Sequence, residues 1–320
     1  MSSEMDLDIY FGVEIEFIAP IKADNWEGAA DIIKQQLTTR RVGSRVGPHI
    51  GALPLKDRDY VLWKIVKDVS INNPRGKFGM EMSSPVFTFS DNNWKAELIE
   101  VWTALSDLEV EQGTSCSTQV HVSVARPDGQ FPVEQARLIA MATVYFEKCI
   151  DALMPKYRRN SRYCQSNRDN SLLGSMSLPE IRKEIEEKED IISLAQLVCP
   201  ARHESAEHGV DSHYRVNFEG INFGTIEFRQ APGSRDAQET EDWINFVCWL
   251  VNAAISRDYF HHERWQRQPE VDDFKAFLRQ DIEGDPDEFW KRIEMYKEKP
   301  DGSDPGSPAG ADTGLQFEME

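Results

Sequence analysis

The chain has 320 residues, of which 40% are hydrophobic, and carries a formal net charge of −19 at neutral pH. This length and hydrophobic content suffice for one large domain, or two smaller ones, with a buried core. The negative charge argues against a nucleic-acid partner, which requires clusters of Lys and Arg, and against an anionic membrane surface.

The cysteines and the apolar segments indicate the compartment. Five cysteines are scattered without a CxxC pair, which is typical of a reducing environment. The N-terminus is acidic before its first apolar run, unlike a signal peptide, and the apolar run Phe246–Ile255 is too short to cross a bilayer. We therefore expect a soluble, cytoplasmic protein.

The first half of the chain predicts strands and helices in alternation. Asp8–Ile18 alternates between apolar and polar residues and predicts a half-buried strand. A helix over Asn25–Arg40 is expected to begin at a cap formed by Asn25 or Asp24. The segments that follow are a Gly- and Pro-rich loop over Gly43–Pro54, strands over Tyr60–Val66 and Lys77–Phe87, a helix from Asp91 or Asn92 to Leu108, a strand over Ser117–Val124, and a helix from Pro132 to about Met154.

The second half begins with a polar, irregular segment, Lys156–Met176, typical of an active-site loop or lid. A loop is expected over Val198–Ser212, and a hairpin from His213–Glu219 and Gly224–Gln230. Helices are predicted over Pro179–Lys188, Ile191–Val198, Ala237–Asp258, Val271–Arg279 and Pro286–Lys297. We expect one domain over residues 1–298, with a disordered acidic tail over 299–320. The order of elements predicts an α+β fold whose antiparallel sheet is covered by helices.

Polar residues recur at alternate positions of these strands, so they share one face of each strand. They are Glu14 and Glu16; Glu81 and Ser83; Gln119, His121 and Ser123; Arg215 and Asn217; and Glu227 and Arg229. Two like charges ~4 Å apart repel by about 4 kcal/mol at an effective dielectric near 20. Acids packed so closely either raise their pKa values or bind cations, and this donor set suits Mg²⁺ or Mn²⁺. A solvated sheet face is the alternative, but lysine is absent from these five faces.

The text and order of several segments resemble the amidoligase family of the carboxylate–amine ligase superfamily, which includes glutamine synthetase and glutamate–cysteine ligase. They are FGVEIEF (Phe11–Phe17), WKIVKDVSI (Trp63–Ile71), EMSSP (Glu81–Pro85), STQVHVS (Ser117–Ser123), RRNSRYC (Arg158–Cys164) and RVNFEGINFGTIEFRQAPGS (Arg215–Ser234).

The resemblance implies an antiparallel sheet funnel of the glutamine-synthetase type. It implies that ATP phosphorylates a carboxylate and that an amine attacks the acyl phosphate to give an amide. It also implies roles for individual residues. Glu14, Glu16, Glu81, Glu227, Gln119 and His121 would hold metal; His121, Arg215, Asn217 and Arg229 would contact ATP phosphates; Arg229 and Glu227 would act in catalysis. The cofactors would be ATP and Mg²⁺, and the partners a small carboxylate and an amine, both amino-acid-like.

Three positions depart from the family pattern. Gln119 replaces the first His of an HxH pair, Val69 replaces the Gly of D-G-S, and Ser123 replaces a Gly. Asp68 is expected to orient the amine or its proton, or to serve only as a turn residue. Arg159 and Arg162, with Arg158 and Tyr163, would clamp the substrate carboxylate or the phosphates, or form a solvated loop.

Two other functions therefore stay open. One is a catalytically degenerate, metabolite-binding member of the same fold, and the other is a hydrolase that depends on divalent metal. The sequence indicates no particular oligomeric state.

Overall fold

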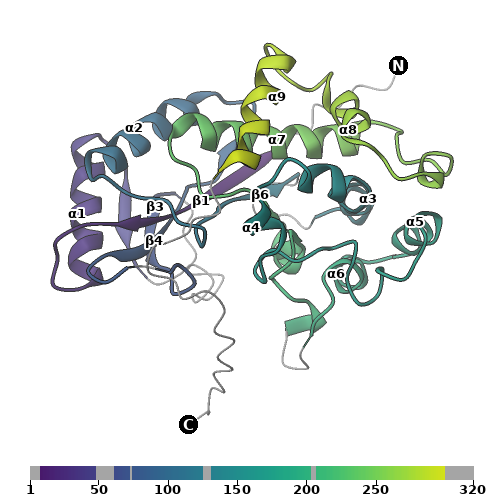
Figure 1. Ribbon diagram of the computed structural model, residues 1–320, viewed down its shortest axis with the longest axis horizontal. Coiled ribbons are helices and arrows are strands. Elements are labelled where there is room, and N and C mark those ends of the chain that lie inside the picture. The colour runs from purple at the N-terminus through teal and green to yellow at the C-terminus, as the bar shows by residue number, and fades with distance from the viewer. Residues whose placement is uncertain (1–7, 48–60, 73, 125–130, 203–206, 300–320) are drawn as a thin grey trace, which may run out of the picture.

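The computed structural model describes residues 8–47, 61–72, 74–124, 131–202 and 207–299 (Figure 1). Within these residues eight strands form one open, mostly antiparallel sheet, which confirms the predicted α+β class. In chain order the strands are β1 (Tyr10–Ala19), β2 (Ser44–Val46), β3 (Trp63–Lys67), β4 (Phe78–Ser83), β5 (Phe87–Thr88), β6 (Thr118–Ser123), β7 (Val216–Asn217) and β8 (Ile226–Phe228). Their order across the sheet is β2-β3-β4-β1-β6-β8-β7, with β5 paired to one end of β1.

The central strand, β1, fixes the two faces of the sheet. Phe11, Val13, Ile15 and Phe17 are at most 1% exposed and point into the apolar core. The residues between them, Gly12, Glu14 and Glu16, face the other side because side chains alternate along a strand. The predicted alternation is confirmed, but the strand is not half-buried, since Glu14 and Glu16 are also buried.

The long helices lie close to their predicted positions. They are α1 (Trp26–Thr39), α2 (Asn93–Asp107), α3 (Val133–Asp151), α5 (Leu178–Glu186), α6 (Ile191–Val198), α7 (Ala237–Ser256), α8 (Val271–Leu278) and α9 (Pro286–Glu294). The side chain of Asn25 caps α1 by accepting from the Gly28 N–H at 2.8 Å, and Asp236 caps α7 by accepting from the Glu239 N–H. Such caps satisfy N–H groups that have no partner within the helix.

A layer of helices covers the apolar face of the sheet. In Figure 1, α2, α7, α8 and α9 lie on one side of β1 and β6, while α4 (Lys156–Arg159), α5 and α6 lie on the other side of the view. Trp243 and Trp249 are buried on α7, and Trp243 stacks on Phe246 with ring centroids 4.9 Å apart. Each such side chain contributes about 1.5–3 kcal/mol on burial.

Several predicted loops are more ordered than expected. Residues 44–46 of the predicted loop 43–54 pair with β3 as the parallel strand β2, whereas 48–54 lie outside the described residues. The segment 156–176 begins with the short helix α4. The predicted hairpin forms, reduced to β7 and β8. Lys299 packs against the domain through the Gly233 carbonyl and Glu239; the rest of the predicted tail, 300–320, is outside the described residues.

Among the residues described, no helix combines the length and the apolar character needed to span a membrane.

Candidate functional site

The strand register brings the predicted polar residues together on one face of the sheet. Glu16 lies opposite Glu81, and Glu14 lies between Ser83 and Gln119. His121 lies opposite Gly12 on one side and Glu227 on the other, and Glu227 in turn pairs with Asn217. Residues opposite each other in an antiparallel sheet share a face. Three separate strands, β1, β4 and β8, therefore deliver their acids to one surface.

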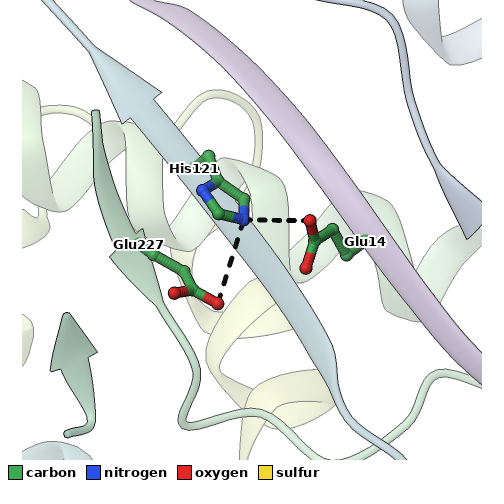
Figure 2. Close-up of side chains that lie close together, drawn as sticks. All are labelled: Glu14, His121 and Glu227. Atoms are coloured by element: carbon green, nitrogen blue, oxygen red, sulfur yellow. Dashed lines mark ion pairs between the residues drawn. The ribbon is translucent and has the colours of Figure 1, made fainter. Parts of the chain in front are cut away.

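The first acid cluster joins Glu14, His121 and Glu227 (Figure 2). The His121 Nε2 lies 3.3 Å from Glu14 Oε1 and 3.8 Å from Glu227 Oε1. Burial alone would lower the pKa of His121, but the Glu14 and Glu227 carboxylates outweigh it and raise the pKa to about 9. In the metal-free protein the imidazolium is thus a cation held between two carboxylates.

The second acid cluster joins Glu16, Glu81 and Asp68. Burial, followed by the charge of Asp68, raises the pKa of Glu16 to about 7, although Arg158 and Arg229 oppose the shift. Burial and the charges of Glu14 and Glu16 raise the pKa of Glu81 well above its usual value. Three neighbouring carboxylates repel one another when they are all ionised, and a bound cation would offset this repulsion.

Asp68 reaches this cluster because the turn that carries it packs directly on the sheet. A Cβ on Gly79, in β4, would lie only 2.8 Å from Ile71 Cβ, so the turn approaches β4 more closely than a side chain would allow. Asp68 Oδ1 accepts from the Ser70 N–H at 2.7 Å and closes the turn. Val69 is 87% exposed and is not among the described residues of positive φ, so this turn forms without the family's glycine.

The donor atoms of both clusters fit a hard divalent ion. In each, one ligand atom per residue lies within 4.8 Å of the others, and carboxylate oxygens dominate. Gln119 lies beside them: its Nε2 donates to Glu16 Oε1, and its buried Oε1 has no hydrogen-bond partner among the residues that the structure describes. A flip of the amide would turn that oxygen toward the acids, where it could serve as a ligand.

Arg229 and Arg158 bound the site on the β8 side. Arg229 donates to Glu227 Oε1 at 2.6 Å, and Glu227 Oε2 accepts from Asn217 Nδ2 at 2.7 Å. Arg158, on α4, is 4% exposed and donates to the Arg229 carbonyl. Both guanidinium groups lower the pKa of Glu16, so two fixed positive charges stand next to the acids.

Arg215 lies apart from this group. Its Nη1 and Nε contact Glu147 Oε1 at 2.9 Å and Asp151 Oδ1 at 3.0 Å, both on α3, and its Nη2 donates to the Arg159 carbonyl. The guanidinium is thus held by α3. Arg159 and Arg162 are exposed, and Arg162 stacks on Tyr163 with its guanidinium carbon 4.7 Å from the ring centroid.

Two residues around the site, Lys64 and Glu147, were not predicted from the sequence. Lys64, 3% exposed and opposite Ser83, adds a lysine to the polar face through a sixth strand, β3. Its alternation with Trp63 and Ile65 was the available signal. Of the arginines predicted in the segment after α3, Arg158 lies next to the acids, whereas Arg159 and Arg162 are exposed. Glu147 is a buried acid among the apolar residues of α3. An acid in such a position is normally paired with a cation or hydrogen-bond donors, and this was the available signal.

Comparison with known proteins identifies the family of the chain. The family model described as "Putative amidoligase enzyme" matches residues 7–251, which include every residue of the two acid clusters and Arg229. The chain therefore belongs to the amidoligase family, a family of amide-forming ligases. A search of curated proteins found no match.

Proposed function

We propose that the protein is an ATP- and Mg²⁺-dependent carboxylate–amine ligase that acts through an acyl phosphate. The observation that carries the proposal is the presence of two neighbouring acid clusters on one sheet face with Arg229 and Arg158 beside them. In this proposal the sheet face serves as one wall of a glutamine-synthetase-like funnel, and residues 1–298 act as one catalytic domain.

The two clusters would hold two ions. Glu14, His121 and Glu227 would hold one, and Glu16, Glu81 and Asp68 the other, with the Gln119 amide oxygen available to either. Bound Mg²⁺ would neutralise the ATP phosphates and orient the γ-phosphoryl group. Because Asp68 belongs to a cluster, we assign it to metal binding rather than to the amine.

The chain's own residues would position the reactants. Arg229 and Arg158 would stabilise the charge on the transferred phosphoryl group, because guanidinium groups pair well with its oxygens. A substrate carboxylate oxygen attacks the γ-phosphorus of ATP, and the bond to ADP breaks. The amine nitrogen then attacks the acyl carbon, phosphate leaves, and the amine releases its proton. The residues at the site supply orientation and charge rather than a covalent nucleophile.

The test is ADP release by the purified protein with Mg²⁺, ATP and pools of carboxylates and amines. Mass spectrometry of the products should show a carboxylate–amine pair joined with the loss of one water. A folded protein that binds no ATP and releases no ADP with any pool would refute the proposal. A Mg²⁺-dependent thermal shift with ATP but no turnover would indicate the degenerate binding protein, and metal-dependent hydrolysis without nucleotide would indicate the hydrolase.

A further inference from the structure

Positive charge is concentrated in one short segment beside the site. Residues 156–168, called here the basic segment, contain five of the chain's 36 basic side chains and none of its 55 acidic ones. They are Lys156, Arg158, Arg159, Arg162 and Arg168. In a chain of net charge −19 such a segment is locally attractive to anions, because exposed charges are screened beyond about 10 Å at 0.1 M salt.

The arginines of the basic segment form no salt bridge with an acid among the described residues, although Arg158 lies near Glu16 and Arg159 near Asp151. Arg158 donates to a backbone carbonyl and Arg162 to the Tyr163 hydroxyl, and none of the four forms a salt bridge with a described carboxylate. Several arginines elsewhere do pair with an acid: they are Arg40, Arg182, Arg257, Arg267 and Arg292. The guanidinium groups of the segment are therefore not held by direct contact with a carboxylate in the described part of the protein.

The basic segment runs outward from the site along the edge of the sheet. Arg158 is buried beside Arg229, whereas Arg159 and Arg162 are exposed. The end of the segment is hydrogen-bonded to the chain leading into β7: Gln165 N–H donates to the His213 carbonyl, and Arg215 N–H donates to the Gln165 carbonyl. The segment thus carries one buried arginine beside the acids and two exposed arginines on the solvent side.

We propose that the exposed arginines Arg159 and Arg162 recruit the carboxylate substrate, and that this substrate is an acidic peptide with several carboxylates. The inference rests on the proposed function and specifies its substrate class. A nucleotide carries its phosphates within a short span, which the two acid clusters and Arg229 already serve. Exposed arginines next to the buried Arg158 suit an anion that extends from the site to the surface, and a guanidinium pairs with a carboxylate through two parallel hydrogen bonds.

The test measures binding without turnover. Fluorescence anisotropy should show that labelled hexaglutamate binds the full chain with Mg²⁺, that hexaglutamine does not, and that affinity falls steeply with added salt. The double variant Arg159→Glu and Arg162→Glu should lose about tenfold in affinity or more, because attraction is replaced by repulsion at two positions. The variant Arg159→Gln and Arg162→Gln should show a smaller loss.

A matched control separates local from global charge. Arg279 and Lys291 are exposed on α8 and α9, so Arg279→Glu with Lys291→Glu changes the net charge equally and should leave hexaglutamate binding unchanged. Equal losses in both double variants, or no binding of hexaglutamate, would overturn the proposal. It would also be overturned if the Arg159/Arg162 variants weakened MgATP or tripolyphosphate binding instead. Because binding is measured without ATP, absent ADP release would count against the proposed function alone.

Discussion

Glu16 combines burial with a position among acids. It is 3% exposed and accepts hydrogen bonds from the Ser117 N–H and from Gln119 Nε2. Burial and Asp68 nevertheless raise its pKa to about 7, so the hydrogen bonds do not offset the cost of its charge. In the metal-free protein its ionised form is therefore destabilising.

We predict that Glu16→Gln stabilises the metal-free protein at pH 8 by on the order of 1–3 kcal/mol, and has little effect at pH 5, where Glu16 is already protonated. The Gln119 amide can flip to accept from the new amide group. Urea unfolding in EDTA at both pH values measures the change. The same variant should lose the Mg²⁺-induced thermal shift and turnover, and a variant with full activity would disprove its role as a ligand.

Glu227→Gln should behave in the opposite way in the metal-free protein. Glu227 accepts hydrogen bonds from Arg229 and Asn217. A neutral Gln at this position would replace the ion pair with Arg229 by a weaker hydrogen bond. We expect a loss of about 1–3 kcal/mol at pH 8, together with loss of turnover. The contrast with Glu16→Gln in the same unfolding assay checks the assignment, since a stabilised Glu227→Gln variant would contradict it.

At the scale of elements, most of the fold follows from the sequence. The alternation in β1 and the cap at Asn25 are local signals, and the structure has both. Strand order is not local: the neighbours of β1 are β4 and β6, and no pattern within Asp8–Ile18 specifies them. The acids could therefore be predicted to share a face, but not to divide into two clusters. Asp68 joins its cluster only through the packing of a turn on Gly79.

Gly79→Ala tests that packing. The new Cβ would lie 2.8 Å from Ile71 Cβ and push the Asp68 turn away from β4. We expect a loss of about 1–3 kcal/mol in stability, as for other overpacked positions, and weaker Mg²⁺ binding in calorimetry. Gly12→Ala is the matched control on the same face of the sheet, because its Cβ would make ordinary contact with Ser84 Oγ at 3.6 Å. Equal effects of the two substitutions on stability would contradict this explanation.

Glu147 connects α3 with the segment that follows α4. It accepts from the Ser166 hydroxyl and from the N–H groups of Asn167 and Arg168, and it pairs with Arg215. Asn167 in turn bonds the backbone of Val216 in β7. One buried carboxylate thus fixes a helix, a loop and the edge strand at once.

We predict that Glu147→Ala destabilises the protein by about 3 kcal/mol, because Arg215 loses one of its two acidic partners and three donors lose their acceptor. Hydrogen exchange at Asn167 and Arg168 should accelerate more than exchange in α7. Glu134→Ala is the control on the same helix: its side chain is 71% exposed and its contact with Arg137 is long, at 3.8 Å. A stability loss shared by both variants would show that the effect comes from α3 rather than from the buried carboxylate.

At the scale of the whole molecule, the two acid clusters set how stability depends on pH. Glu16 and His121 both bind protons more tightly in the folded protein than when unfolded, with pKa values raised from 4.5 to about 7 and from 6.5 to about 9. A group with a raised folded pKa stabilises the fold below its unfolded pKa and loses that contribution as the pH rises. Glu81 adds to the same trend.

We therefore predict that the metal-free protein loses stability steadily between pH 5 and pH 9, in calorimetry or urea unfolding with EDTA. Glu16→Gln should flatten the lower part of this range. Saturating Mg²⁺ should oppose the decline, because deprotonated carboxylates and neutral His121 are the forms that bind metal, and ligand at a hundred times its Kd stabilises by about 2.7 kcal/mol. The Mg²⁺-induced shift should accordingly grow with pH and be accompanied by proton release. A metal-free protein whose stability rises from pH 5 to pH 9 would show that the pKa values of Glu16 and His121 are not raised by folding, and would contradict the two acid clusters.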